Sequence, residues 1–296
     1  MFRILTAFEI FVETAKVKFT RIFNSSKVSS APLKRPIQYD APRGGGAITE
    51  AASLIKLNDA RARFDVTGKD LTVAVLDSGL AEHDDFSSSR ILTKLNYTSS
   101  NGRSPSNAND LHGHGTHVTG IIAADGVHTG IAPKSNIIPI KVLRNDTDAT
   151  IESWKALKKA LVWVLENYDL YKISVVNISI ADISNNQSDK GFENRKTRKD
   201  IKSAIKSLRG LKIPVVVSAG NYYGLYNRRD KRQGMSWPAI IHETISVGAV
   251  YDSVLNKQEL EDGKHVYPSG ASANSTVPDA ITPYSHRLHE SSASIY

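Results

Sequence analysis

The sequence has 296 residues, of which 40% are hydrophobic and 23% charged, an ordinary composition for a folded protein with a large core. It contains no cysteine, which excludes disulfides, thiolate-bound metals and a cysteine nucleophile. The net charge of +8 comes largely from residues 1–50 and from two basic runs, Lys190–Lys202 and Arg228–Arg232. We interpret these runs as solvated loops, and we expect no nucleic-acid partner.

The first 47 residues have no pattern typical of a globular fold. The apolar stretch Ile4–Val12 is interrupted by Glu9, so it predicts a short amphipathic helix rather than a signal peptide. No apolar run approaches the roughly 18–20 residues that a membrane span needs. Residues 24–47 are rich in Ser, Pro, Arg and Gly and read as a linker. We therefore expect residues 1–47 to be an N-terminal segment and linker, and residues 48–296 to form one domain.

Apolar runs of strand length alternate with amphipathic helical segments after residue 48. The runs are Leu71–Leu76, Ile137–Leu143, Ser174–Ile180, Ile213–Ala219 and Thr244–Val250. Because they are continuous rather than alternating, they predict strands that are buried on both faces. Helices are predicted over Thr150–Asn167 and Lys199–Arg209, the second ending before Gly210. This order predicts an α/β fold with a doubly wound, mostly parallel sheet flanked by helices.

Three polar residues lie where such a sheet gathers its functional groups, at the carboxyl ends of the strands. Asp77 ends one buried run, Asn221 follows another, and His114 begins a predicted helix. Each has a structural explanation on its own, since carboxylates and amides often form turns or helix caps. Together they fit serine acyl transfer, in which a carboxylate orients an imidazole base and an amide stabilises the oxyanion.

The same segments resemble the motifs of the subtilisin-like serine proteases. The aspartate motif of that family is similar to Val75–Gly79, its histidine motif to His114–Gly120, and its oxyanion motif to Ser218–Asn221, in the same chain order. The resemblance covers about residues 50–290. It implies a subtilisin-like peptidase domain over residues 48–296 that hydrolyses peptide bonds in peptides or proteins.

The resemblance also implies roles for individual residues. Asp77 and His114 would be two members of the catalytic triad, and Asn221 would be part of the oxyanion hole. Ser179 and Ile180 would bind the substrate backbone as an added strand. His117 would be structural. No metal and no cofactor are implied.

The nucleophile of the family is the departure from this pattern. Its motif, Gly-Thr-Ser-x-Ala-x-Pro, does not occur in the sequence. We expect the domain to lack its C-terminal part, and the chain to be inactive unless a serine segment is supplied. Ser272 is interpreted as an ordinary loop serine. Two explanations stay open: a truncated serine endopeptidase, which we favour, and a catalytically inactive remnant that binds peptide.

A zinc hydrolase is the remaining alternative. His112, His114 and His117 approximate the His-x-His-x-Asp-His cluster of metallo-β-lactamase-like proteins, and histidines at such spacing can bind zinc. Thr116 stands where that pattern has an aspartate, and the pattern leaves Asp77 and Asn221 unexplained.

Overall fold

The computed structural model describes most of the predicted domain. The described residues are 49–98, 108–144, 151–191, 195–227, 233–252, 254, 265–266, 271–273 and 275–288. The predicted N-terminal segment and linker, residues 1–47, lie outside the described residues. The same is true of the basic run Arg228–Arg232.

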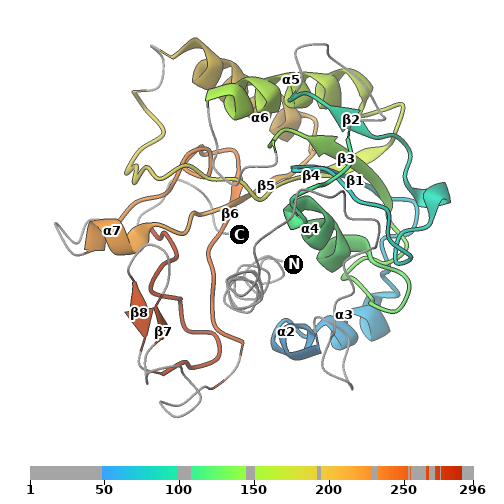
Figure 1. Cartoon of the computed structure of the whole chain (residues 1–296), viewed down its shortest axis with the longest axis horizontal. Helices are drawn as coiled ribbons and strands as arrows, with labels where there is room; N and C mark the ends of the chain where they lie inside the picture. The colour runs from blue at the N-terminus through green and yellow to red at the C-terminus, as the bar shows by residue number, and fades with distance from the viewer. Residues whose placement is uncertain are drawn as a thin grey trace, which may run out of the picture.

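A six-stranded sheet forms the centre of the fold (Figure 1). Its strands, in spatial order, are β2 (Leu95–Asn96), β3 (Asn136–Lys141), β1 (Thr72–Asp77), β4 (Ile173–Ile178), β5 (Val215–Ser218) and β6 (Ile245–Val247). All five neighbouring pairs are parallel. The five predicted strands are therefore confirmed, with small differences at their ends. Strand β2 was not predicted, because two residues are too short to show a periodic pattern.

Helices cover both faces of this sheet (Figure 1). The long helices are α4 (His114–Ala123), α5 (Ile151–Asn167) and α6 (Lys196–Gly210). Successive side chains of a strand point to opposite faces, and β1 shows this directly. Ala74 and Leu76 pack in the core cluster that contains α5 and α6, whereas Val73 and Val75 pack against α4. The predicted doubly wound α/β fold is confirmed.

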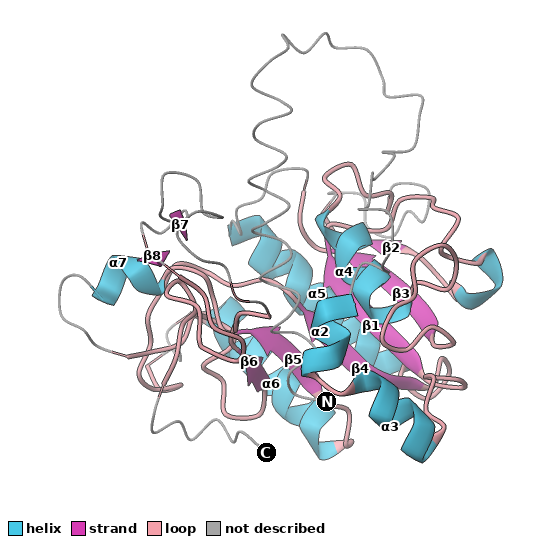
Figure 2. Cartoon of the chain, turned by 90° about the horizontal axis from the view of Figure 1, so that it is seen from below, coloured by secondary structure: helices cyan, strands magenta, loops and turns pink. Residues whose placement is uncertain are grey.

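The shorter elements surround this three-layered core. They are α2 (Thr49–Leu54), α3 (Leu57–Phe64), the 3-10 turn η1 (Ser88–Arg90), α7 (Tyr223–Asn227), and an antiparallel pair, β7 (His265–Val266) with β8 (Ser272–Ala273). The pair lies near α7 in both views (Figures 1 and 2). Ser272 is thus in a short strand, and its interpretation as a loop serine is wrong.

One predicted helix end is also wrong. Helix α6 includes Gly210, and its C-cap is Leu211. The left-handed residue that follows the helix is Lys212, with φ of 62°. The helix extends one residue beyond the predicted end because Leu211 N–H still donates to the Ser207 carbonyl at 3.1 Å.

The carboxyl edge of the sheet collects the polar residues that the sequence singled out. Asp77 is the last residue of β1 and lies in register with Lys141, the last residue of β3. Ser179 follows β4, and Asn221 follows β5 after a short turn. Among the described helices, none is both long and apolar enough to cross a membrane.

Candidate active site

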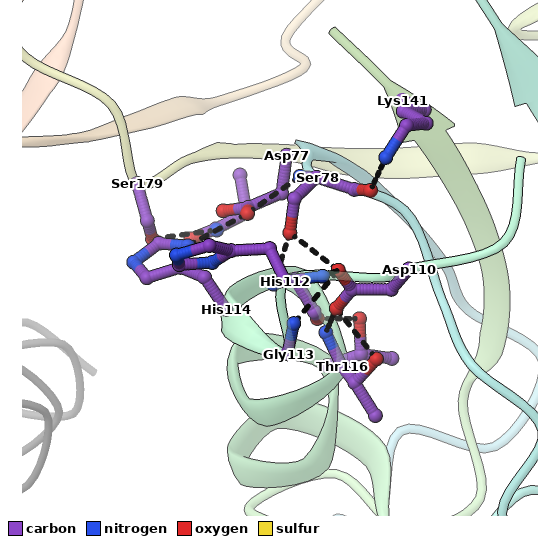
Figure 3. Close-up of polar contacts among 12 residues, drawn as sticks. Asp77, Ser78, Asp110, His112, Gly113, His114, Thr116, Lys141 and Ser179 are labelled. Atoms are coloured by element: carbon purple, nitrogen blue, oxygen red, sulfur yellow. Dashed lines mark hydrogen bonds and ion pairs between the residues drawn. The ribbon is translucent and has the colours of Figure 1, made fainter. Parts of the chain in front are cut away.

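A buried aspartate and a partly exposed histidine are hydrogen bonded at the carboxyl edge of the sheet. Nδ1 of His114 lies 2.7 Å from Oδ1 of Asp77 (Figure 3). The Asp77 side chain has no exposed surface, whereas 21% of the His114 side chain is exposed. A carboxylate can only accept at this distance, so the imidazole donates through Nδ1–H. The carboxylate therefore fixes both the tautomer and the orientation of the ring.

The two elements that carry this pair meet because of local structure at their ends. Strand β1 is buried along its whole length, which carries Asp77 to the sheet edge without exposing it. Helix α4 begins at His114, and the preceding Gly113 has φ of 95°, a left-handed conformation that suits glycine. Gly115 packs so closely that a Cβ atom would lie 3.0 Å from the Gly79 backbone nitrogen. A larger residue at position 115 would push α4 away from β1.

Asn221 lies at the same edge, after β5, with β4 between it and Asp77. It follows Gly220, which has φ of 109°. The Gly220 carbonyl accepts a 2.9 Å hydrogen bond from the backbone N–H of His286. The turn that carries Asn221 is therefore held from a segment much later in the chain. The structure places Asn221 at the predicted edge, and its role in an oxyanion hole stays a prediction.

The predicted substrate-binding residues follow β4 at the same edge. Asn177 is buried in β4, and its Nδ2 donates a 3.1 Å hydrogen bond to Oγ of Ser179. This contact fixes the side chain of Ser179. Ile180 is only 5% exposed and packs in the main core. Any contact of residue 180 with a peptide would therefore involve its backbone, and substrate binding here stays a prediction.

The other two histidines of the motif do not form a metal site with His114. Within the described part of the chain, no three His, Cys, Asp or Glu side chains are placed to bind one metal ion. The rings of His112 and His114 lie side by side, with centroids 6.2 Å apart. Burial, with a smaller effect of His114, lowers the pKa of His117 to about 4, so His117 is neutral at pH 7. The zinc interpretation loses its support from this geometry.

Comparisons with known proteins agree with this arrangement. The sequence profile of the subtilase family matches residues 68–295, which include Asp77, His114 and Asn221. The chain belongs to the subtilase family.

Individual subtilases show how far the similarity extends. The major intracellular serine protease of Bacillus subtilis is 28% identical over 207 residues, which cover 69% of this chain and 58% of that protein. The intracellular serine protease of Paenibacillus polymyxa is 28% identical over 266 residues, covering 84% and 74%. The solved structure of the S41 psychrophilic protease has a TM-score of 0.55 at 19% identity, over 76% of this chain and 61% of that one. This last likeness shows the fold alone.

Two residues at this subtilase site were missed by sequence reasoning. Asp110 and Lys141 are buried, and both contact Ser78, the residue after Asp77 (Figure 3). Lys141 is the one charged residue in the predicted apolar run Ile137–Leu143, which was the available signal, whereas its register with Asp77 is seen only in the structure. Asp110 lies in a loop with no periodic pattern and gave no such signal.

Proposed function

We propose that the protein is a serine endopeptidase that acts on peptide or protein substrates. The observation that supports this most directly is the 2.7 Å hydrogen bond between buried Asp77 and partly exposed His114. Membership of the subtilase family gives the pair its chemical context. The chain spans 58% of the length of the Bacillus subtilis relative, so the activity is our proposal for the whole protein.

The proposed mechanism assigns one task to each residue. His114 Nε2 removes the proton from a serine hydroxyl as that oxygen attacks the substrate carbonyl, and the same proton then goes to the leaving amine. Asp77 holds the ring and stabilises the imidazolium that forms between these steps. Asn221 donates a hydrogen bond to the oxyanion. The backbone at Ser179 and Ile180 binds the peptide as an added strand.

The serine nucleophile is the component that we assign to no residue. The family motif Gly-Thr-Ser-x-Ala-x-Pro does not occur among these 296 residues. A peptide-binding protein without hydrolysis is therefore the alternative that the experiment has to separate from a peptidase.

An assay of the hydrolysis of an unfolded protein substrate tests the proposal. The enzyme for this assay is purified from the cells that naturally produce it. We expect turnover in the wild type, loss of turnover in His114→Ala, and a fall in kcat of about 10⁴-fold in Asp77→Asn, because the amide favours the wrong tautomer. His242→Ala, a change at an exposed histidine, is the matched control. Retained peptide binding without turnover in the wild type would contradict the proposal and favour the binding protein.

A further inference from the structure

Ser78 connects the catalytic pair to two buried charged residues (Figure 3). Its backbone N–H, its hydroxyl and its carbonyl each take part in a hydrogen bond. Its N–H donates to Asp77 Oδ1 at 2.7 Å, and its hydroxyl donates to Asp110 Oδ1 at 3.0 Å. Its carbonyl accepts from Lys141 Nζ at 2.5 Å. Ser78 Oγ also accepts from the N–H of Gly115, in the first turn of α4, at 2.8 Å. One residue thus joins β1, β3, α4 and the loop before α4.

Asp110 anchors the start of α4. In addition to Ser78, its Oδ1 accepts from the N–H groups of His112 and Gly113, both at 2.9 Å. Its Oδ2 accepts from the N–H of Thr116 at 2.8 Å and from the Thr116 hydroxyl at 2.7 Å. A carboxylate at a helix N-terminus satisfies N–H groups that have no partner inside the helix. The position of His114, between these anchored residues, is therefore fixed by Asp110.

Hydrogen bonding keeps Asp110 charged although it is only 6% exposed. Burial by itself raises the pKa of its carboxyl group. The bonds from the Thr116 side chain and from three backbone N–H groups outweigh burial, so that the pKa of Asp110 lies below its usual value. The site therefore contains two buried carboxylates, Asp77 and Asp110.

Lys141 is the buried cation beside these carboxylates. It is 5% exposed and lies in register with Asp77 on the neighbouring strand. Burial lowers the pKa of its ammonium group, and the negative charges of Asp110 and Asp77 oppose that lowering. Together with His114, these three groups carry one net negative charge when the imidazole is neutral, and no net charge when it is protonated.

We propose that Asp110 and Lys141 are positioning residues of the site, which hold Asp77 and His114 through Ser78 and tune the protonation of His114 by their opposite charges. The inference rests on the proposed roles of Asp77 and His114, but its test does not need hydrolysis. Neither residue contacts the reacting atoms, so neither is a catalytic residue.

The proposal predicts shifts of opposite sign in the titration of His114. Asp110→Asn removes a negative charge, which makes the imidazolium less favourable, so the midpoint moves to lower pH. Lys141→Met removes a positive charge, so the midpoint moves to higher pH. We expect about half a pH unit in each direction, since charges near a partly exposed group interact by on the order of 1 kcal/mol. Asp77, His112 and His117, the other titratable groups that face His114, are unchanged in both variants.

NMR titration of the His114 imidazole in protein with labelled histidine measures these midpoints, with the signal assigned by its loss in His114→Gln. Asp125 and Lys134 form an ion pair at 2.6 Å with 30% and 54% of their side chains exposed, so Asp125→Asn and Lys134→Met remove the same charges elsewhere. Both controls should keep the wild-type midpoint. Lys141→Arg keeps the positive charge, so it should also titrate with the wild-type midpoint.

Two results would overturn the inference: unchanged midpoints in both variants, or shifts in the same direction. If Asp110→Asn does not fold, Lys141→Met alone decides, because an unshifted or lowered midpoint contradicts the proposal. If the wild type does not hydrolyse peptides, the proposed function is wrong, but the titration of His114 still tests this inference. If the protein hydrolyses peptides but the His114 midpoints do not shift, this inference is wrong and the proposed function stands.

Discussion

The backbone N–H of His286 donates a 2.9 Å hydrogen bond to the carbonyl of Gly220, the residue before Asn221. The His286 ring continues this contact, since its Nδ1 lies 3.0 Å from Oγ of Ser236. A third bond joins the Tyr223 N–H to the Tyr284 carbonyl at 3.0 Å. The turn that carries the proposed oxyanion donor is thus packed from one side by residues 284–286, and its position depends on them.

Replacement of Gly220 should therefore be costly. A Cβ atom there would overlap the Ser236 hydroxyl and lie 3.1 Å from His286 Nδ1, at φ of 109°. Gly191 is the matched control, because its φ of 88° is similar and a Cβ atom would meet nothing within 4 Å. We expect Gly191→Ala to lower the free energy of unfolding by about 1 kcal/mol, and Gly220→Ala by about 2 kcal/mol more. Equal losses in urea unfolding would show that the turn is not closely packed.

Acid should destabilise the fold through two histidines. Burial, with a smaller effect of Arg287, lowers the pKa of His286 to about 4, and burial likewise lowers the pKa of His117 to about 4. The ordinary value is 6.5. Because both pKa values are lower in the folded state, their contribution to stability is fully present above pH 6.5 and is lost as the pH falls towards 4.

Urea unfolding as a function of pH measures this loss. His286 is 2% exposed, and its share between pH 6.5 and 4 should be about 3 kcal/mol. Between pH 4 and 6.5, His286→Gln should reduce the number of protons taken up on unfolding by up to one, and so make the unfolding free energy depend less on pH. His242→Gln, at an exposed position, should leave it as in the wild type. An unchanged pH dependence in His286→Gln would show that folding does not lower the pKa of His286.

A partly buried ion pair next to the predicted substrate strand gives a further test. Arg198 donates to Asp182 Oδ2 at 2.8 Å, with about 15% and 14% of the side chains exposed. The guanidinium also lies 5.1 Å from the ring centroid of Trp237. We expect Arg198→Met to cost about 3 kcal/mol, because it leaves the Asp182 carboxylate without its partner. The double variant with Asp182→Asn should cost less than the sum of the two single variants.

The exposed pair of Lys172 and Asp169 is the control for this cycle, with 72% and 82% of the side chains exposed. Its removal should change the free energy of unfolding by less than about 1 kcal/mol. Strict additivity of Arg198→Met and Asp182→Asn would mean that the two residues are not energetically coupled.

Residues with a strong local pattern were predictable, and residues that depend on distant contacts were not. Asp77 ends a continuous apolar run, and His114 lies in a glycine-rich motif that starts a helix, so both could be placed at one edge of a parallel sheet. The contribution of Asp110 depends on bonds to Ser78 and Thr116 that form only when β1 and α4 meet.

The same reasoning explains the errors at element ends. Gly210 is a common residue after a helix, but Leu211 can still bond to Ser207, which extends α6 by one residue. The antiparallel partner of Ser272 is Val266, and nothing local to Ser272 indicates that pairing. The helix end is decided by one further helical hydrogen bond that Gly210 does not prevent, and the strand at Ser272 by its pairing with β7.

Covalent labelling with a fluorophosphonate tests the central claim most directly, with the protein as it is made in its own cells. If the Asp77 and His114 pair activates a serine, the wild type will be modified at one serine, and His114→Ala will not be modified. Asp77→Asn should react far more slowly, whereas His242→Ala should react as the wild type does. Labelling of His114→Ala at the wild-type rate would contradict the account, because the nucleophile would then not depend on this imidazole.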